Sequence, residues 1–242
     1  MNLNVHEKIL RDALGDGDTM SEQALGWVIT ANKLSDLYQF TPERHFDNAP
    51  DRETICDRWK HGLKVFLDRA IERSAPMGRE KQMLENRKEA LKAFGAATHA
   101  LADFYAHTNW VELSVAQKNL EALAPLFGET CQSSDFPTQL ESGYFNLRYG
   151  MCGCPKVAGE LTPPRGYRFC HEQLAKDHPD KGHGAEKISV DGPTYHEVAV
   201  LLATRATRQL WEVLHDGIVR RYTDTTTDAE TLFVKLAWGE DS

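Results

Sequence analysis

Apolar residues recur at helical spacing through most of the first half of the chain. They begin with Val5, Ile9 and Leu10 and resume at Leu25, after the turn-forming glycines and aspartates of residues 15–18. The clearest amphipathic pattern covers residues 51–73. Its apolar stripe consists of Ile55, Trp59, Leu63, Phe66, Leu67, Ala70 and Ile71. These patterns predict helices joined by polar turns.

Helical periodicity continues over about residues 79–108 and, more briefly, over 112–125, where a proline ends it. Between residues 127 and 192 glycine, proline and cysteine are frequent and the periodicity disappears, as in an insertion that has a function or forms a lid. Helix resumes at Pro193, continues to about Tyr222, and a last short helix covers residues 228–238. No segment alternates as a strand would. We therefore predict an all-α single domain over residues 1–242 with a long irregular insertion.

The composition is that of an ordinary globular protein, since 242 residues of which 41% are hydrophobic can bury a core. The most apolar run, residues 198–203, is much shorter than a membrane-spanning helix needs. The first ten residues carry charges where a signal peptide would be apolar, which favours a cytoplasmic protein and leaves other export routes open. The formal charge of −8 argues against a nucleic-acid partner, because that affinity depends on clustered Lys and Arg.

Five cysteines are present, at Cys56, Cys131, Cys152, Cys154 and Cys170. Their odd number excludes complete pairing within one chain. Three interpretations stay open: disulfides formed in an oxidising compartment, buried thiols, and a zinc knuckle built from Cys152, Cys154, Cys170 and His171. The Cys-x-Cys spacing is tighter than that of most structural zinc sites.

Three potential metal ligands, His99, Asp103 and His107, are each four residues apart on a predicted helix. Their side chains therefore project from one face within roughly 80°. The small residues on that face, which would leave room for ions and substrate, are Gly95, Ala96, Ala102 and Ala106. Imidazole and carboxylate together suit zinc, and a carboxylate between two histidines can bridge two ions. The alternative is a solvated polar face or an ordinary core histidine.

Residues 97–113, ATHALADFYAHTNWVEL, closely resemble the signature of the Het-C family, named for a fungal heterokaryon-incompatibility protein. That family is similar to the zinc-dependent phospholipase C and single-strand nuclease superfamily, which is all-α. Weaker resemblance, in the family's order, lies at HEKIL (6–10), ANKLSDL (31–37), RHFDN (44–48), LESGYF (140–145), CHEQLAKD (170–177) and YHEVAVLLATRATRQL (195–210).

The resemblance implies which distant residues meet. The ligands that it implies for a first ion are Asp36, His45, His99 and Asp103. A second ion would take His107, a later histidine and a carboxylate, and a third would take His6 together with Asp103. Asp36 would also orient or deprotonate the attacking water, and Asp103 would bridge ions as the second catalytic carboxylate.

The later histidine is either His171 or His196. The family pattern places an acid four residues after it, whereas Ala175 and Val200 stand there in this chain. A core histidine is the alternative for His196. Asp47 and Glu112 are expected to contact the ligand histidines and fix their orientation.

These observations predict a metal-dependent phosphoric-ester hydrolase, a phosphatase or a phospholipase C-like enzyme, in which two or three divalent ions activate water. The histidines favour zinc, and the carboxylates also allow calcium. The substrate would be a phosphoester, with a phospholipid head group as one candidate. A second hypothesis is a non-catalytic Het-C-type interaction or incompatibility module with a structural metal. A third, a single-strand nuclease, is disfavoured by the net charge and by the lack of an aromatic and basic groove.

Overall fold

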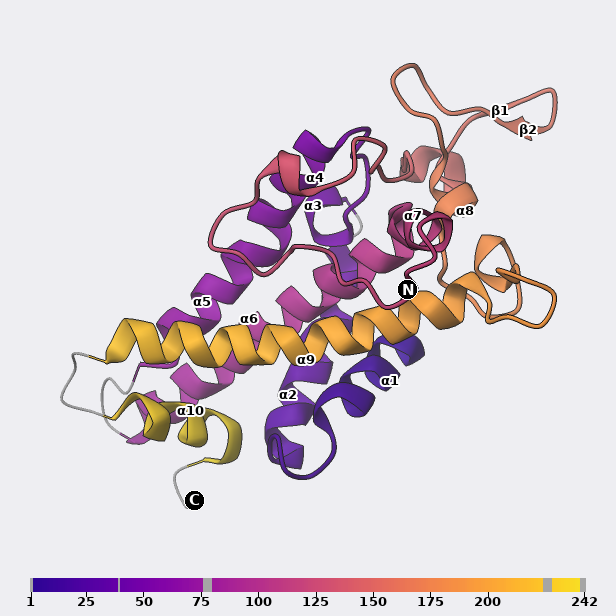
Figure 1. Cartoon of the computed structure of the whole chain (residues 1–242). Coiled ribbons are helices and arrows are strands. Elements are labelled where there is room, and N and C mark those ends of the chain that lie inside the picture. The colour runs from indigo at the N-terminus through magenta and orange to yellow at the C-terminus, as the bar shows by residue number, and fades with distance from the viewer. Residues whose placement is uncertain (1, 39, 76–79, 224–227, 240–242) are drawn as a thin grey trace.

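One long helix, α6 (Glu80–His107), runs through the middle of the computed structural model, which describes residues 2–38, 40–75, 80–223 and 228–239 (Figure 1). It packs against α2 (Glu22–Ser35), α5 (Val65–Arg73) and α9 (Tyr195–Tyr222). The other α-helices are α1 (Leu3–Leu14), α3 (Pro42–His45), α4 (Arg52–Arg58), α7 (Trp110–Ala116), α8 (His171–Leu174) and α10 (Ala229–Trp238). The predicted all-α class is confirmed.

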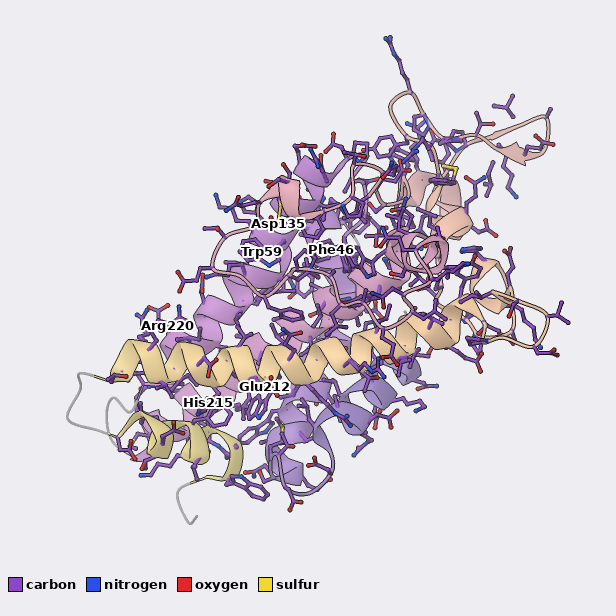
Figure 2. The ribbon with its side chains drawn as sticks, in the orientation of Figure 1. Phe46, Trp59, Asp135, Glu212, His215 and Arg220 are labelled. Atoms are coloured by element: carbon purple, nitrogen blue, oxygen red, sulfur yellow. A yellow bond between two sulfur atoms is a disulfide. The ribbon has the colours of Figure 1, made fainter. Side chains whose placement is uncertain are left out.

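The core lies between these helices and holds α3 and α9 against α6. Phe46, labelled in Figure 2, is fully buried and meets Phe104 of α6 edge-on, with 5.2 Å between ring centroids. Phe94 makes the same kind of contact with Trp211 of α9, also at 5.2 Å. Aromatic pairs in this geometry add to the stabilisation that burial alone provides. They fix the C-terminal half of α6, where the candidate ligands lie.

The helix predicted over residues 51–73 is present, but its middle is a π-helical turn. It consists of α4, the π turn η2 (Trp59–Lys64) and α5, and the predicted stripe faces the core. Gly62 lies in the π turn where α3 crosses it. A Cβ atom at this position would lie 1.8 Å from the carbonyl oxygen of Glu43, so only glycine fits. Apolar periodicity does not reveal a π turn, because the stripe continues across it.

We expect Gly62→Ala to reduce the free energy of unfolding by about 1–3 kcal/mol, because the added methyl group must displace the backbone of α3. Gly26→Ala is the matched control: it lies mid-helix in α2, and an added Cβ would meet nothing within 4 Å. That change should stabilise the protein by up to about 1 kcal/mol. Urea unfolding of both variants measures the difference, and equal midpoints would contradict the close approach of α3.

The segment over residues 127–192 is largely irregular, as predicted. It contains the short 3₁₀ turns η3 (Ser133–Asp135), η4 (Leu147–Cys152) and η5 (His183–Ala185), the helix α8, and an antiparallel pair of strands, β1 (Lys156–Val157) and β2 (Glu160–Leu161). Two-residue strands are too short to show alternation, and the sequence analysis missed them. The helix predicted over 112–125 ends early, at Ala116, and Lys118 has a left-handed φ of 56°.

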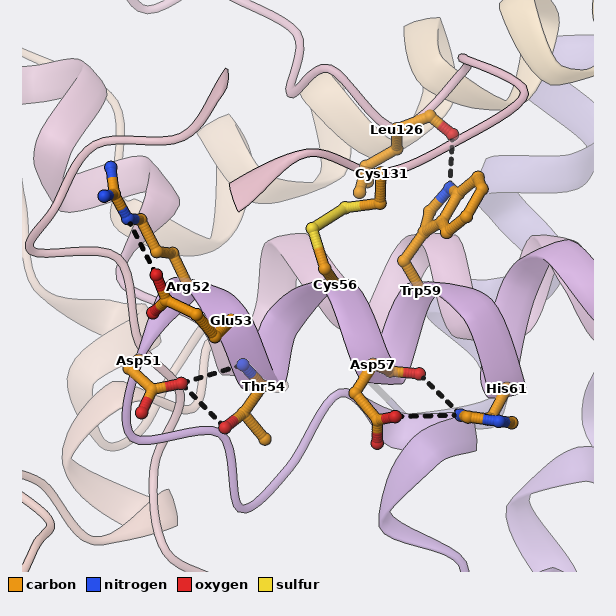
Figure 3. Close-up of a disulfide and its surroundings, with 10 residues drawn as sticks. All are labelled: Asp51, Arg52, Glu53, Thr54, Cys56, Asp57, Trp59, His61, Leu126 and Cys131. Carbon is orange, nitrogen blue, oxygen red and sulfur yellow. Dashed lines mark hydrogen bonds and ion pairs between the residues drawn. A yellow bond between two sulfur atoms is a disulfide. The ribbon is translucent and has the colours of Figure 1, made fainter. Parts of the chain in front are cut away.

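Two disulfides are present. Cys56 is bonded to Cys131, which attaches the irregular segment to α4 (Figure 3), and Cys154 is bonded to Cys170. The zinc-knuckle interpretation is therefore wrong, because two of its four proposed ligands are bonded to each other. The side chain of Cys152 lies outside the described part of the chain.

Among the helices that the structure describes, we find none with the length and apolar character needed to cross a membrane.

Candidate metal centre

Two groups of potential metal ligands lie around the C-terminal half of α6. The ligand atoms within each group are all within 4.8 Å of one another. The first group consists of His6, Asp36, His99 and Asp103, from α1, the 3₁₀ turn η1 (Asp36–Tyr38) and α6. The second consists of Asp47, His107 and His171, from the segment after α3, the end of α6 and the start of α8. Segments distant in sequence thus meet at one helix.

Asp103 is the centre of the first group and is fully buried. Its Oδ1 lies 3.2 Å from His6 Nε2, and its Oδ2 lies 2.9 Å from His45 Nδ1 and 3.2 Å from His99 Nε2. Burial would raise the pKa of Asp103, but electrostatic interactions with His99 and His107 and the hydrogen bond with His45 act against burial, and that pKa lies well below its ordinary value. The carboxylate is therefore charged and contacts three histidines at once.

Several imidazole nitrogens in and beside this group have no hydrogen-bond partner among the described residues. They are Nδ1 of His6, Nδ1 of His99 and Nε2 of the neighbouring His45, all buried. Burial lowers the pKa of His6 to about 3 and also lowers the pKa of His99, so these rings are neutral at pH 7. A buried polar atom without a partner is costly, and a neutral imidazole nitrogen is the form that binds a metal ion. The donor set therefore fits a cation.

The second group is arranged around His107. Its Nδ1 donates a hydrogen bond to the carbonyl of His45 (2.9 Å), so its Nε2 carries the lone pair when the ring is neutral. That Nε2 lies 3.0 Å from Oδ1 of Asp177. Two acceptors that face each other at this distance repel unless a proton or a metal ion lies between them. This nitrogen is therefore positioned for a cation.

His171 completes the second group. Its Nδ1 lies 2.9 Å from Asp47 Oδ1, and its Nε2 lies 3.6 Å from Asp177 Oδ2. Burial would lower the pKa of His171, but the two carboxylates outweigh burial and raise it to about 10. Charges on Asp47 and Asp177 thus attract positive charge to this group, as either a proton or a metal ion.

Asp47 is held by backbone in an unusual conformation. Its neighbours Phe46 and Asn48 both have left-handed φ angles, 52° and 57°, which are uncommon for residues other than glycine. The Asn48 side chain stabilises this turn by bonding to the backbone of Phe145 in both directions, at 2.9 and 2.7 Å. Strain of this kind persists only where the surroundings fix it, and it directs Asp47 toward His107 and His171.

Asp177 is the site residue that the sequence analysis missed. The family pattern predicts an acid four residues after His171, but α8 ends at Leu174 and Ala175 is extended (ψ 122°). The chain therefore returns the carboxylate to His171 after six residues instead of four. The signal was present, because the CHEQLAKD segment quoted for the resemblance ends with this aspartate.

Both groups reach one cavity of about 550 Å³, the first through Asp36 and the second through all three of its members. The residues that line it are Asn2, Leu3, Asn4, Asp36, His45, Asp47, His107, Phe145, His171, Asp177 and His178. Four of them, from Phe145 onward, belong to the irregular segment, which therefore contributes to the pocket. His45 joins the two groups, because its ring contacts Asp103 while its carbonyl accepts the bond from His107.

The small residues of α6 do not leave an open face, and this part of the prediction is wrong. A Cβ at Gly95 would lie 2.4 Å from the carbonyl oxygen of Val28, so the glycine allows α2 to pack closely. Ala102 and Ala106 are buried in the core. The small side chains therefore serve helix packing, and the cavity lies beyond the ends of the ligand side chains.

Two predicted residues lie elsewhere. His196 is in neither ligand group, and its Nδ1 donates a hydrogen bond to the carbonyl of Lys176 (2.6 Å). Glu112 pairs with Lys176 at 2.9 Å and with His183 at 2.6 Å, and the structure does not bring it to a predicted ligand histidine. Asp47, expected only to orient histidines, is itself placed as a ligand.

Comparison with known proteins supports a family for part of the chain. The model of the family "Heterokaryon incompatibility protein Het-C" matches residues 55–135. The match covers about a third of the chain, includes His99, Asp103 and His107, and supports the Het-C family. The link from Het-C to the phospholipase C superfamily is a resemblance only.

The chain is also similar to von Willebrand factor A domain-containing protein 7 from Mus musculus, with 28% identity over 239 residues, and from Homo sapiens, with 28% over 236 residues. Each match covers 87% of this chain and 24% of the relative, so the chain spans about a quarter of these proteins. No solved structure matches the chain significantly.

Proposed function

We propose that the protein is a metal-dependent phosphoric-ester hydrolase that holds two divalent cations. One observation carries the proposal: two groups of largely buried histidines and aspartates, linked by His45, reach a single cavity, the first of them through Asp36. The first cation would be held by His6, Asp36, His99 and Asp103, and the second by Asp47, His107, His171 and Asp177. His6 falls in the first group, which supports two ions, and the described residues form no separate ligand set for a third.

Bound divalent cations would supply Lewis acidity, which activates water and neutralises the charge of a phosphoryl group. Each group contains two imidazoles, which suits zinc better than calcium because calcium prefers oxygen ligands alone. The described residues that line the cavity include no lysine or arginine.

Asp36 is the residue best suited to accept a proton from water. Its side chain is 25% exposed and lines the cavity, whereas Asp103 is buried. Burial and the nearby Asp103 charge raise the pKa of Asp36 above its ordinary value. A carboxylate with a raised pKa is a stronger base, so Asp36 takes the proton while Asp103 holds the histidines.

A phospholipid head group is the substrate that the surface around Asp36 supports. Leu37 and Phe40 follow it closely in sequence and are 74% and 80% exposed. Large exposed apolar side chains beside a pocket are typical of an interaction site, and here they could contact acyl chains while the head group enters the cavity.

The two disulfides support folding in an oxidising compartment, in place of the cytoplasm expected from the N-terminal charges.

The test combines elemental analysis of the purified protein with assays on a phosphomonoester, a phosphodiester and phospholipid vesicles. We expect about two zinc ions per chain, hydrolysis of at least one substrate, and loss of both after chelation. Zinc added back should restore hydrolysis, with calcium as the comparison. Bound zinc without any hydrolysis would instead support the non-catalytic Het-C-type module.

A further inference from the structure

Lys176 is a lysine with no solvent exposure, in the irregular segment directly before Asp177. Lysine is almost never fully buried unless its charge is compensated, because an ammonium group loses much hydration energy on burial. The proposed function gives this side chain no role, since it neither lines the cavity nor belongs to a ligand group. Its contacts show which parts of the site it fixes in place.

The ammonium group has three short partners, which match its three hydrogens. It donates to the carbonyl of Leu174 (2.7 Å) and to the carbonyl of Thr108 (2.9 Å), and it pairs with Glu112 Oε1 (2.9 Å). Burial would raise the pKa of Glu112, but the charge of Lys176 outweighs burial and lowers it. The buried charge is thus balanced, and its hydrogen bonds join the end of α8 to the segment that connects α6 and α7.

The backbone of Lys176 is fixed as well. Its amide donates to the carbonyl of Ala106 (3.1 Å), and its carbonyl accepts the bond from His196. Ala106 and Thr108 lie on either side of His107, and Leu174 ends the helix that begins with His171. Lys176 therefore contacts the backbone on both sides of His107 and at the end of α8. Because it directly precedes Asp177, these contacts also fix the position of that aspartate.

We propose that Lys176 is a positioning residue for the second cation, which fixes His107 and Asp177 at the separation that a shared metal ion requires. It is supported by Glu112, its counter-ion, and by His196, which holds its carbonyl. This inference rests on cation binding at the second group, as proposed above. It gives His196 a role through Lys176 in place of direct contact with an ion, and it gives Glu112 a role through Lys176 in place of contact with a ligand histidine.

The experiment is a zinc titration of metal-free protein followed by calorimetry. His171→Ala identifies the binding phase of the second group, because that phase should disappear. Lys176→Met combined with Glu112→Gln removes the buried charge and its counter-charge together, which avoids an unpaired buried ion. We expect it to weaken the same phase 10- to 100-fold, as loss of outer partners of a metal site does, and to leave the other phase unchanged.

Two further variants keep the result decisive. Lys8→Met removes an exposed lysine of α1 and should change neither phase. His196→Ala removes the bond to the Lys176 carbonyl and leaves the Lys176–Glu112 pair in place, and we expect it to weaken the second phase alone, by about 10-fold. It replaces the double variant if that one does not fold.

Weakening of the second phase alone supports the proposal, whereas a purely structural role would lower thermal stability and affect both phases or neither. Two unchanged phases in a folded variant overturn the role of Lys176 and leave the proposed function intact. Absence of the second phase from the wild-type protein overturns both.

Discussion

Asp103→Asn should abolish hydrolysis and remove bound zinc from the first group. The side chain keeps its size, but the charge that faces His6, His45 and His99 at 2.9–3.2 Å is lost. An amide oxygen is a far weaker zinc ligand than a carboxylate, and each outer partner of a metal site is already worth 10- to 100-fold in affinity or activity. We therefore expect a loss in zinc affinity well above about 100-fold, measured by elemental analysis and titration.

The control for this variant is Asp12→Asn, an exposed aspartate of α1 that pairs with Lys8. It should keep full metal content, because exposed ion pairs contribute little and it lies in neither group. Zinc content equal to wild type in Asp103→Asn would show that the centre has been assigned wrongly. Loss of zinc with retained hydrolysis would show that the reaction does not need the metal ion of the first group.

The part of the site on α6 could be predicted from the sequence, because helical spacing fixes which side chains share a face. His99, Asp103 and His107 do lie along one side of the helix, and they fall into two groups of potential ligands. Spacing carries no information about partners outside the helix. Asp36 and His45 were reached only through the Het-C resemblance, which supplied the pairing of distant segments.

The errors have a common physical origin: helical spacing and residue type do not show which distant parts of the chain come into contact. Asp177 was missed because α8 ends at Leu174, which moves the acid beyond helical spacing. Gly95 was interpreted as space for a ligand, whereas it allows the approach of Val28. Lys176 attracted no notice, since nothing in its neighbourhood predicts that a lysine there is completely buried. Each of these features depends on tertiary contacts.

Replacing Cys56 and Cys131 together by serine should reduce the free energy of unfolding by about 4 kcal/mol. The disulfide closes a loop of 75 residues, and the chain entropy that it removes from the unfolded state corresponds to this amount. It also holds the irregular segment near α4, where Trp59 Nε1 donates to the carbonyl of Leu126 at 2.7 Å (Figure 3). Neither cysteine lines the cavity, so metal content of the folded variant should be unchanged.

The second disulfide provides the comparison. Cys154 and Cys170 are 16 residues apart, so their replacement should cost less, about 3 kcal/mol. Because Cys170 directly precedes His171, this variant should also bind the second zinc more weakly. The variant without Cys56 and Cys131 should bind it as the wild type does. Chemical unfolding with and without a reductant, together with zinc titration, separates the two effects. If a reductant leaves the wild-type midpoint unchanged, the disulfides do not stabilise the fold, and the argument for an oxidising compartment loses its basis.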